Sequence, residues 1–278
     1  MVSSPTKTSN LGGRMGHILA ISNNKGGVGK STATANLAHA LTNKKKRVLV
    51  VDADSQCNLT GTFLDSPWSG NSLLELLDGD GVAVETCIAA APEYERLSVL
   101  PNKSGSAALE PDLSRREDFG WFLLRERLRD YALRNFDLTL IDCPPNLGLF
   151  SLQAMIASDF ILVPVEAGSR YAMDGLDRTV ETIDDIAQAD TAGNPGRFLR
   201  LLINKADRRT AVSRVSIEQI QQVYGERVFK TIIPINTDIQ QAELVRKTVI
   251  RHASKSPGAN AFRTLAGELL GILDAEIC

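Results

Sequence analysis

HILAISNNKGGVGKSTATANLAHAL, residues 17 to 41, is the stretch of sequence that decides the fold. It begins with an apolar run of strand type at 18–22, passes through a glycine-rich turn at 25–31, and continues with helical spacing to 43. A strand, a glycine-rich loop and a helix in this order form the context that a phosphate-binding loop requires. Glycines let the backbone curl so that N–H groups point at phosphate oxygens, and the helix adds its positive N-terminal end. This stretch therefore predicts a nucleotide site.

The loop carries two lysines with different expected roles. Lys30 is expected over the β- and γ-phosphates, and the Ser31 hydroxyl is expected to ligate Mg²⁺. In the usual pattern G-x-x-x-x-G-K-[ST] the first glycine would fall on Asn24; this chain instead has a second lysine, Lys25, before the double glycine. Since Lys30 already occupies the phosphates, Lys25 is better placed to reach a nucleotide held by another subunit. The predicted nucleotide-binding residues of the loop are Lys25, Gly26, Gly27, Val28, Gly29, Lys30, Ser31 and Thr32.

Length and composition limit the class of protein. The 278 residues are enough for one large α/β domain, and 43% hydrophobic with 23% charged residues is ordinary for a globular chain. No apolar run approaches the ~20 residues of a membrane span. Residues 1–15 are polar, without the apolar core of a signal peptide, and predict a disordered leader before a single domain at 16–278. The four cysteines show no paired spacing, which argues against a disulfide framework or a zinc site and favours the cytoplasm.

Charge is distributed unevenly along the chain. Residues 197–263 contain 13 Lys and Arg against 5 Asp and Glu, whereas the other 211 residues contain 18 and 28. A basic C-terminal third suggests a surface that faces a polyanion. The alternative is a solvated basic face without a partner.

Carboxylates follow two predicted buried strands. Asp52 and Asp54 come at the end of the strand 48–52, where ligands lie in open α/β sheets. Asp54 lies further out, and we expect it to orient the attacking water near the metal, while Asp52 orders the loop or the water shell of the metal. Asp142 ends the strand 137–142. An Asp at the end of an apolar strand, opposite a phosphate loop, can hold Mg²⁺ through a water. The alternative for the first pair is an acidic turn with local hydrogen bonds.

The remaining chain alternates between strands and helices. Expected strands lie at 97–100, 160–165, 198–204 and 228–234, and expected helices at 72–77, 82–91, 119–134, 171–189, 212–224, 238–247 and 258–273. This alternation predicts an α/β fold, a single-domain P-loop NTPase whose mostly parallel twisted sheet has helices on both faces. Asn204, Pro234 and Asn236 are expected at the sheet edge that carries the phosphates, where an amide can read adenine. The alternative is that they are simple turn residues.

Four stretches together resemble the ParA/Soj partition ATPases, of the deviant-Walker P-loop class that also contains MinD. They are KGGVGKS at 25–31, DADSQCNLT at 52–60, LIDCPPNLG at 140–148, and IPINTDIQQAE followed by SPGANAFRTLA. The resemblance covers roughly residues 16 to 275 and implies an ATP-hydrolysing sandwich homodimer. It implies Lys25 as the lysine that reaches the partner's phosphates, Asp54 as the residue that positions water, and Asp142 as the Walker-B acid. Ser55 departs from the family pattern, which has proline there.

The resemblance also implies how DNA is bound. The short leader leaves no room for a helix-turn-helix domain, so binding is expected from the ATPase fold itself. Basic residues without a base-reading motif favour phosphate contacts that do not depend on DNA sequence. The candidates for this contact are Arg227, Lys230, Arg246, Lys247, Arg251 and Lys255.

The function expected from these features is an ATPase, with ATP and Mg²⁺ as cofactors, that partitions plasmid or chromosome DNA. ATP closes the dimer and permits nucleoid binding, and a ParB-like partner stimulates hydrolysis. One alternative is a ParA-like positioner of a protein cargo on the nucleoid. Another is a MinD-like membrane-cycling ATPase, but the acidic chain end (Glu268, Asp274 and Glu276 against Arg263) disfavours anionic lipid, so no membrane partner is expected. An iron–sulfur ATPase would need a pair of suitably placed cysteines, and none is evident.

Overall fold

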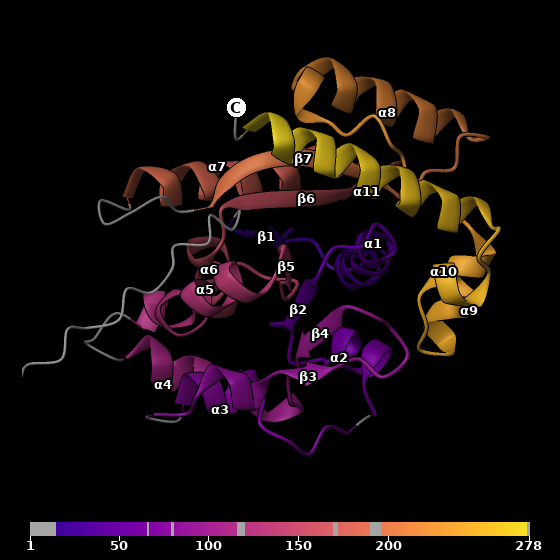
Figure 1. The fold of residues 1–278 in the computed structure, drawn as a ribbon. Coiled ribbons are helices and arrows are strands. Elements are labelled where there is room, and N and C mark those ends of the chain that lie inside the picture. Colours follow the sequence, from indigo (N-terminus) through magenta and orange to yellow (C-terminus); the bar gives the residue numbers. More distant parts are fainter. Residues whose placement is uncertain are drawn as a thin grey trace, which may run out of the picture.

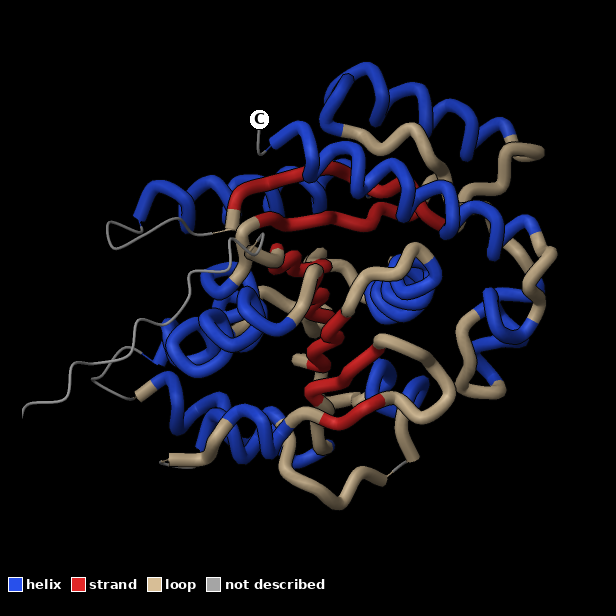
Figure 2. The backbone as a smooth tube through the Cα atoms, viewed as in Figure 1, coloured by secondary structure: helices blue, strands red, loops and turns tan. Residues whose placement is uncertain are grey.

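A twisted seven-stranded sheet forms the centre of the protein (Figures 1 and 2). The computed structural model describes residues 15–65, 67–78, 81–115, 120–168, 172–189 and 196–276. Residues 1–14 of the expected leader, and the expected helix starts at 119 and 171, lie outside these ranges. The strands are β1 (His17–Ile21), β2 (Val48–Asp52), β3 (Ala89–Ala90), β4 (Leu97–Leu100), β5 (Leu138–Asp142), β6 (Phe160–Glu166) and β7 (Arg197–Asn204).

The order of strands is β3-β4-β2-β5-β1-β6-β7, and every neighbouring pair is parallel except β3 and β4. In the register of the central strands, Asp142 lies beside both Ile21 and Asp52. The carboxyl ends of β1, β2 and β5 therefore meet at one edge, where the phosphate loop leaves β1. This confirms the predicted mostly parallel α/β fold.

Helices cover both faces of the sheet (Figure 1). Residues of the central strands alternate between the two faces: Ile18 and Ala20 pack on one side, and Leu19 and Ile21 on the other. Such strands are buried on both faces, which explains their continuous apolar sequence. One face carries α1 (Lys30–Asn43), α2 (Asn58–Phe63), α9 (Thr237–Leu244), α10 (Val249–His252) and α11 (Pro257–Glu276). The other carries α3 (Leu73–Asp78), α4 (Glu110–Ser114), α5 (Leu123–Asn135), α6 (Leu149–Ala157), α7 (Ala172–Ala189) and α8 (Ala211–Tyr224).

Two predicted elements were wrong. Residues 228–234 form no strand; they run beside β7 with isolated bridges at Val228 and Pro234. Between these bridges the Phe229 and Ile233 N–H groups donate to the Leu201 and Ile203 carbonyls of β7, both at 2.9 Å. The N–H groups of Lys230 and Thr231 instead donate to the Glu268 carboxylate of α11, at 2.6 and 2.9 Å, which interrupts the ladder. Residues 82–91, predicted as a helix, contain only a 3₁₀ turn (Val84–Cys87), followed by the antiparallel β3. Three further 3₁₀ turns lie at Ser104–Leu109, Gly120–Phe122 and Gly225–Arg227.

The Glu268→Ala variant tests the contact between the Glu268 carboxylate and the backbone of residues 230 and 231, where a strand was predicted. The change leaves two N–H groups and the Thr231 hydroxyl without their acceptor. We expect the free energy of unfolding to fall by about 1–3 kcal/mol in urea titrations. The matched control is Glu218→Ala on the exposed side of α8, which should change stability by less than about 0.5 kcal/mol. Equal stability of the two variants would contradict this account.

Candidate nucleotide site

A cavity of about 570 Å³ lies at the edge where β1, β2 and β5 end. Its size is within the roughly 300–1,000 Å³ of small-molecule sites. The phosphate loop and the start of α1 form one wall, the loop after β2 with α2 forms the second, and the end of α9 forms the third. The lining residues are Gly26, Gly27, Gly29, Lys30, Ser31, Thr32, Ala35, Asn36, Asp54, Gln56, Cys57, Asn58, Gly61, Thr62, Pro145, Lys205, Glu243, Arg246 and Lys247.

The loop has a backbone that only glycine accepts without strain. Gly27 and Gly29 have φ angles of 77° and 86°, and a Cβ on Gly29 would lie 2.5 Å from Asn204 Nδ2. Asn204 donates from Nδ2 to the Val28 carbonyl at 2.8 Å and accepts from the Lys205 N–H at 2.9 Å. Both ends of this amide are engaged, so in this structure Asn204 holds the loop.

The two other residues predicted to read adenine lie outside the cavity lining. Pro234 and Asn236 precede α9, and Asn236 occupies the N-cap position of that helix. The Asn236 Oδ1 atom is buried and has no hydrogen-bond partner among the residues that the structure describes. Their role toward adenine stays a prediction.

Two ammonium groups contact carbonyl oxygens of the loop. Lys30 is 6% exposed, and its Nζ donates to the carbonyls of Asn23 and Lys25 at 3.1 and 3.2 Å. Burial lowers the pKa of Lys30, and the charge of Asp142 opposes this shift. Lys205, which the sequence reasoning missed, donates to the Gly27 carbonyl at 2.6 Å. Both cations stand where they can bind the oxygens of a phosphate chain.

Lys25 differs from Lys30 in its surroundings. It is absent from the residues that line the cavity, although Gly26 next to it is present. The Lys25 N–H donates to Asn23 Oδ1 at 2.9 Å, and its Nζ lies 3.9 Å from the Glu166 carboxylate at the end of β6. The side chain is about one-third exposed, so it is accessible from outside the subunit.

Asp142 provides the clearest fit to a bound cation. Its carboxylate is fully buried, and neither oxygen has a hydrogen-bond partner in the described part of the chain. Burial raises the pKa of Asp142 and the charge of Asp52 adds to this, while Ser31 and Lys30 oppose it. The Ser31 hydroxyl lies close enough to favour the charged carboxylate but forms no hydrogen bond of ordinary geometry with it. Buried carboxylates are normally satisfied, so one left in this way beside Ser31 suits a magnesium shell.

The acidic loop after β2 is held by Asp52. Its Oδ2 atom accepts from the Thr60 N–H and hydroxyl at 2.8 and 2.7 Å, and its Oδ1 from the Asp54 N–H at 3.2 Å. Burial raises the pKa of Asp52 to about 6, and these hydrogen bonds oppose the shift. Asp54 is 7% exposed and lines the cavity. The structure thus separates the two acids, with Asp52 ordering the loop and Asp54 facing the ligand space.

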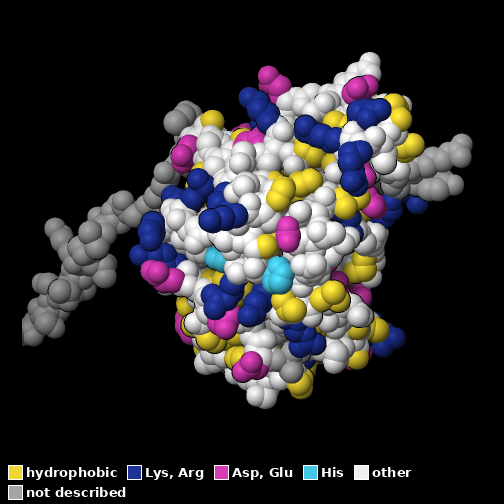
Figure 3. Space-filling view, turned by 90° about the vertical axis from the view of Figure 1, so that its right-hand side faces the viewer, with side chains coloured by type: hydrophobic (Ala, Val, Ile, Leu, Met, Phe, Trp, Pro, Cys, Tyr) yellow, Lys and Arg dark blue, Asp and Glu magenta, His cyan; other side chains and the backbone are white. Residues whose placement is uncertain are grey.

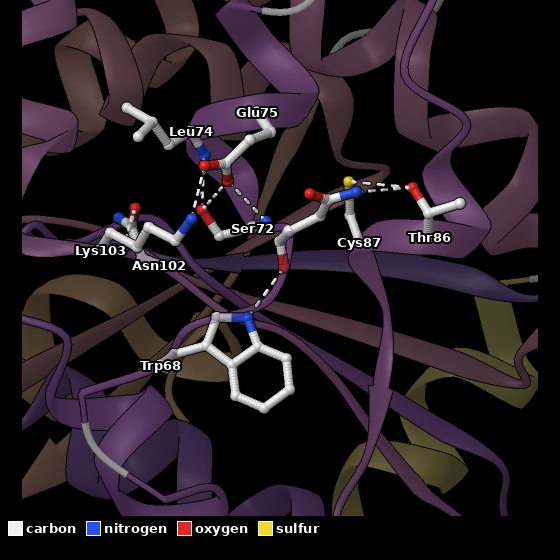
Figure 4. Close-up of polar contacts among 9 residues, drawn as sticks. Trp68, Ser72, Leu74, Glu75, Thr86, Cys87, Asn102 and Lys103 are labelled. Atoms are coloured by element: carbon white, nitrogen blue, oxygen red, sulfur yellow. Dashed lines mark hydrogen bonds and ion pairs between the residues drawn. The ribbon is translucent and has the colours of Figure 1, made fainter.

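Four polar residues from the segment that the sequence left unassigned, Ser72, Glu75, Asn102 and Lys103, support this loop. The Asn102 N–H donates to the Thr60 hydroxyl at 3.0 Å, and the Asn102 Oδ1 accepts from the Lys103 N–H at 2.8 Å. Figure 4 shows Lys103 and Ser72 both directed at the Glu75 carboxylate. A continuous set of polar contacts therefore connects Asp52 to the start of α3.

The six predicted DNA contacts differ in their surroundings. Arg246 and Lys247 line the cavity, and Arg251 pairs with Glu93 at 2.9 Å. Arg227 lies over the Phe198 ring, 4.4 Å from its centroid. On the face with α9, α10 and α11, basic side chains are spread between hydrophobic ones (Figure 3).

A groove beside α11 collects cations that the sequence reasoning missed. Lys230, from the predicted set, lines a groove of about 540 Å³ together with Lys44 and Arg263. The fourth charged group of this groove is Glu268, whose oxygens accept from backbone N–H groups. Lys255 is exposed.

The comparisons with known proteins agree with this geometry. A family model described as an AAA domain matches residues 16–194. The chromosome-partitioning ATPase Soj of Thermus thermophilus is 35% identical over 254 residues, covering 91% of this chain and 94% of Soj. The sporulation initiation inhibitor Soj of Bacillus subtilis is 32% identical over 260 residues, covering 92% and 98%.

The chain belongs to the ParA/Soj family of P-loop ATPases.

Solved structures related to this family member contain nucleotide. Cobyrinic acid a,c-diamide synthase from Mycobacterium smegmatis, with bound ADP and magnesium, is 30% identical, has a TM-score of 0.77, and covers 92% of this chain and 94% of its own. MinD from Pyrococcus horikoshii, complexed with Mg-ADP, is 26% identical with a TM-score of 0.75 and coverages of 92% and 96%.

None of the helices described is both long and apolar enough to cross a bilayer. Within the described ranges, no three His, Cys, Asp or Glu side chains gather to hold a metal. A magnesium site in this family member needs no such cluster, because Mg²⁺ keeps waters and phosphate oxygens as ligands beside one or two protein groups.

Asp142→Asn tests whether the buried carboxylate is kept for a cation. We expect the nucleotide-free variant to melt at least about 2 °C higher than wild type, since relief of about 1 kcal/mol shifts a domain of this size by about 2–4 °C. Adding MgATP should raise the melting temperature of wild type but hardly that of the variant. Asp112→Asn, at an exposed position, is the control for both measurements. A variant that gains as much from MgATP as wild type would refute the assignment.

Proposed function

We propose that this protein is a DNA-partition ATPase in which ATP closes a homodimer that binds DNA without sequence preference. A ParB-like partner stimulates hydrolysis and so releases the dimer from the nucleoid. The observation that carries the proposal is that Lys25 does not line the cavity of its own subunit, whereas Lys30 does, and that its partly exposed ammonium lies 3.9 Å from Glu166. A cation in the phosphate loop that does not face its own phosphates is suited to those of a second subunit.

The residues of the cavity fit MgATP. Gly26 to Thr32 cradle the phosphates, and Ser31 and Asp142 hold the metal shell. Mg²⁺ held there would neutralise negative charge on the phosphate chain. Asp54 orients the attacking water, and Lys30 with the partner's Lys25 stabilises the charge that develops on the γ-phosphate. Catalysis on this scheme is positioning and electrostatics, with no covalent step by the protein.

Lys25→Ala tests the lysine in trans. We expect ATP turnover to be abolished while ATP binding is largely kept, because the cavity retains Lys30. The measurements are phosphate release and calorimetric ATP titration on the same preparation. Turnover at the wild-type rate would end the assignment.

Mixing two inactive variants separates action in trans from action within the subunit. In a mixed dimer of Lys25→Ala and Asp54→Ala subunits, one site combines an intact Asp54 with a Lys25 from the partner. An equimolar mixture should then recover about a quarter of wild-type turnover, as expected for random pairing in a two-fold dimer. No recovery would mean that Lys25 acts on its own nucleotide.

DNA binding is supported by the basic groove beside α11. Lys44, Lys230 and Arg263 line it, and the carboxylate of Glu268 is occupied by backbone donors. Three cations against one carboxylate leave the groove with excess positive charge, which favours a phosphate backbone, and such binding weakens as salt rises. We assign the DNA surface to this groove and to Lys255.

The expected DNA binding depends on nucleotide and salt. Filter binding of a random-sequence duplex should be tight with MgATP, weak with ADP or no nucleotide, and lower at 200 than at 50 mM salt by about tenfold or more. Lys44→Ala/Lys230→Ala should weaken it without changing ATP affinity. Equal binding in all nucleotide states would remove the switch.

The alternatives use the same cycle with another partner. A protein cargo positioned on the nucleoid requires the same DNA surface, and co-purified cargo would identify it. The membrane alternative is disfavoured, because the apolar side of α11 is used in the core, with Leu265 and Leu269 fully buried. Sedimentation with anionic liposomes and ATP separates this alternative from DNA partition.

A further inference from the structure

Arg246 occupies a backbone position at which helices normally end in glycine. Helix α9 closes with two hydrogen bonds, from the Arg246 N–H to the Glu243 carbonyl at 3.0 Å and from the Lys247 N–H to the Ala242 carbonyl at 2.9 Å. In this motif the first residue beyond the helix is left-handed, and Arg246 has a φ of 52°. Glycine adopts this conformation without strain, whereas arginine carries a Cβ that opposes it. A residue held in this conformation at a cavity motivates a hypothesis about the function of its side chain.

The side chain of Arg246 extends from α9 to α2 across the cavity lining. A Cβ built on Gly61 of α2 would lie 3.8 Å from Arg246 Nη1 and 3.9 Å from Cδ. Gly61 and Arg246 both line the cavity that contains the phosphate loop. The guanidinium therefore connects the end of α9 with α2, that is, the third wall of the cavity with the second.

The guanidinium has no partner of its own. Within the described ranges it forms neither an ion pair nor a hydrogen bond. Glu243, three residues earlier on α9, is instead hydrogen-bonded to the hydroxyl of Thr32. The charged side chains that line the cavity are Lys30, Lys205, Arg246 and Lys247 against Asp54 and Glu243. An unpaired guanidinium in a cavity with excess positive charge is suited to an anion, and its planar fork matches phosphate oxygens.

We propose that Arg246 binds the phosphate chain of ATP within its own subunit, from the side opposite the loop, and thereby ties α9 to α2. This inference rests on the proposed function, because it takes MgATP as the ligand of the cavity. It removes Arg246 from the DNA-contacting residues predicted from the sequence. It also explains why the chain tolerates a strained arginine where glycine would suffice for the backbone.

Lys45 provides a matched control. It follows α1 in the same motif and has a φ of 65°. Its N–H donates to the Thr42 carbonyl at 2.8 Å, and the Lys46 N–H donates to the Leu41 carbonyl at 3.2 Å. It lies at the far end of α1 from the phosphate loop and does not line the cavity. Lys45→Gly therefore repeats the change in backbone strain and charge without touching the nucleotide.

The test compares Arg246→Gly and Lys45→Gly with wild type by calorimetric titration with MgATP. Both variants should melt at or above the wild-type temperature, since glycine relieves strain at a left-handed position. Arg246→Gly should bind ATP about tenfold more weakly, which is about 1.4 kcal/mol, while Lys45→Gly binds as wild type does. Arg246→Lys should recover part of the loss, and raising salt should weaken ATP binding less in Arg246→Gly than in wild type.

Each other result overturns the inference in a recognisable way. If wild type itself binds no ATP, the proposed function fails together with this inference. If wild type and Arg246→Gly bind ATP equally, only this inference fails. Unchanged ATP affinity with weakened DNA binding returns Arg246 to the DNA surface. Equal losses in both glycine variants would show a general backbone effect.

Discussion

The carboxylate of Asp142 is buried at the carboxyl end of the central strand β5 without a hydrogen-bond partner in the described structure, and the arrangement of the site follows from it. A charge in that position is unfavourable unless a cation or a donor reaches it. The register of β5 with β1 and β2 aligns Asp142 with the ends of both neighbours, so the phosphate loop and the acidic loop start beside it. The ammonium group of Lys30 partly compensates for the charge of Asp142, and burial lowers the pKa of Lys30 itself. Apolar burial therefore stabilises the fold, while the site retains a negative charge that is only partly compensated. A magnesium nucleotide can compensate it.

Local patterns were enough to predict most of the sheet and the phosphate loop. The glycines, Lys30 and Ser31 lie where a strand, a turn and a helix require them, and Asp142 ends its strand as its apolar neighbours indicate. The strand predicted at 228–234 failed for a reason that no local pattern contains. The Glu268 carboxylate, nearly 40 residues away in sequence, takes the N–H groups that a ladder would need.

The parts of the site that sequence reasoning missed come from distant segments. Lys205, Glu243 and the Thr60–Asn102 contact depend on which loops the tertiary fold brings to one edge. Asn204 was correctly placed at that edge, but its amide is engaged by the loop backbone. Charge composition indicated a polyanion partner, yet it did not separate cations that face the cavity, such as Arg246, from cations in the groove beside α11, such as Lys230.

The position of Lys25 has a consequence for how the proposed ATPase responds to its own abundance. A subunit that keeps this lysine near Glu166, away from its own cavity, holds ATP without the cation that completes the site. If Lys25 acts in trans as proposed, ATP hydrolysis would require an encounter between two copies, and the rate per molecule would rise with local concentration until all copies are paired. Isolated molecules would keep their ATP bound, and molecules at high local concentration would hydrolyse it. On the proposed mechanism, the hydrolysis rate per molecule would therefore report the local concentration of the protein.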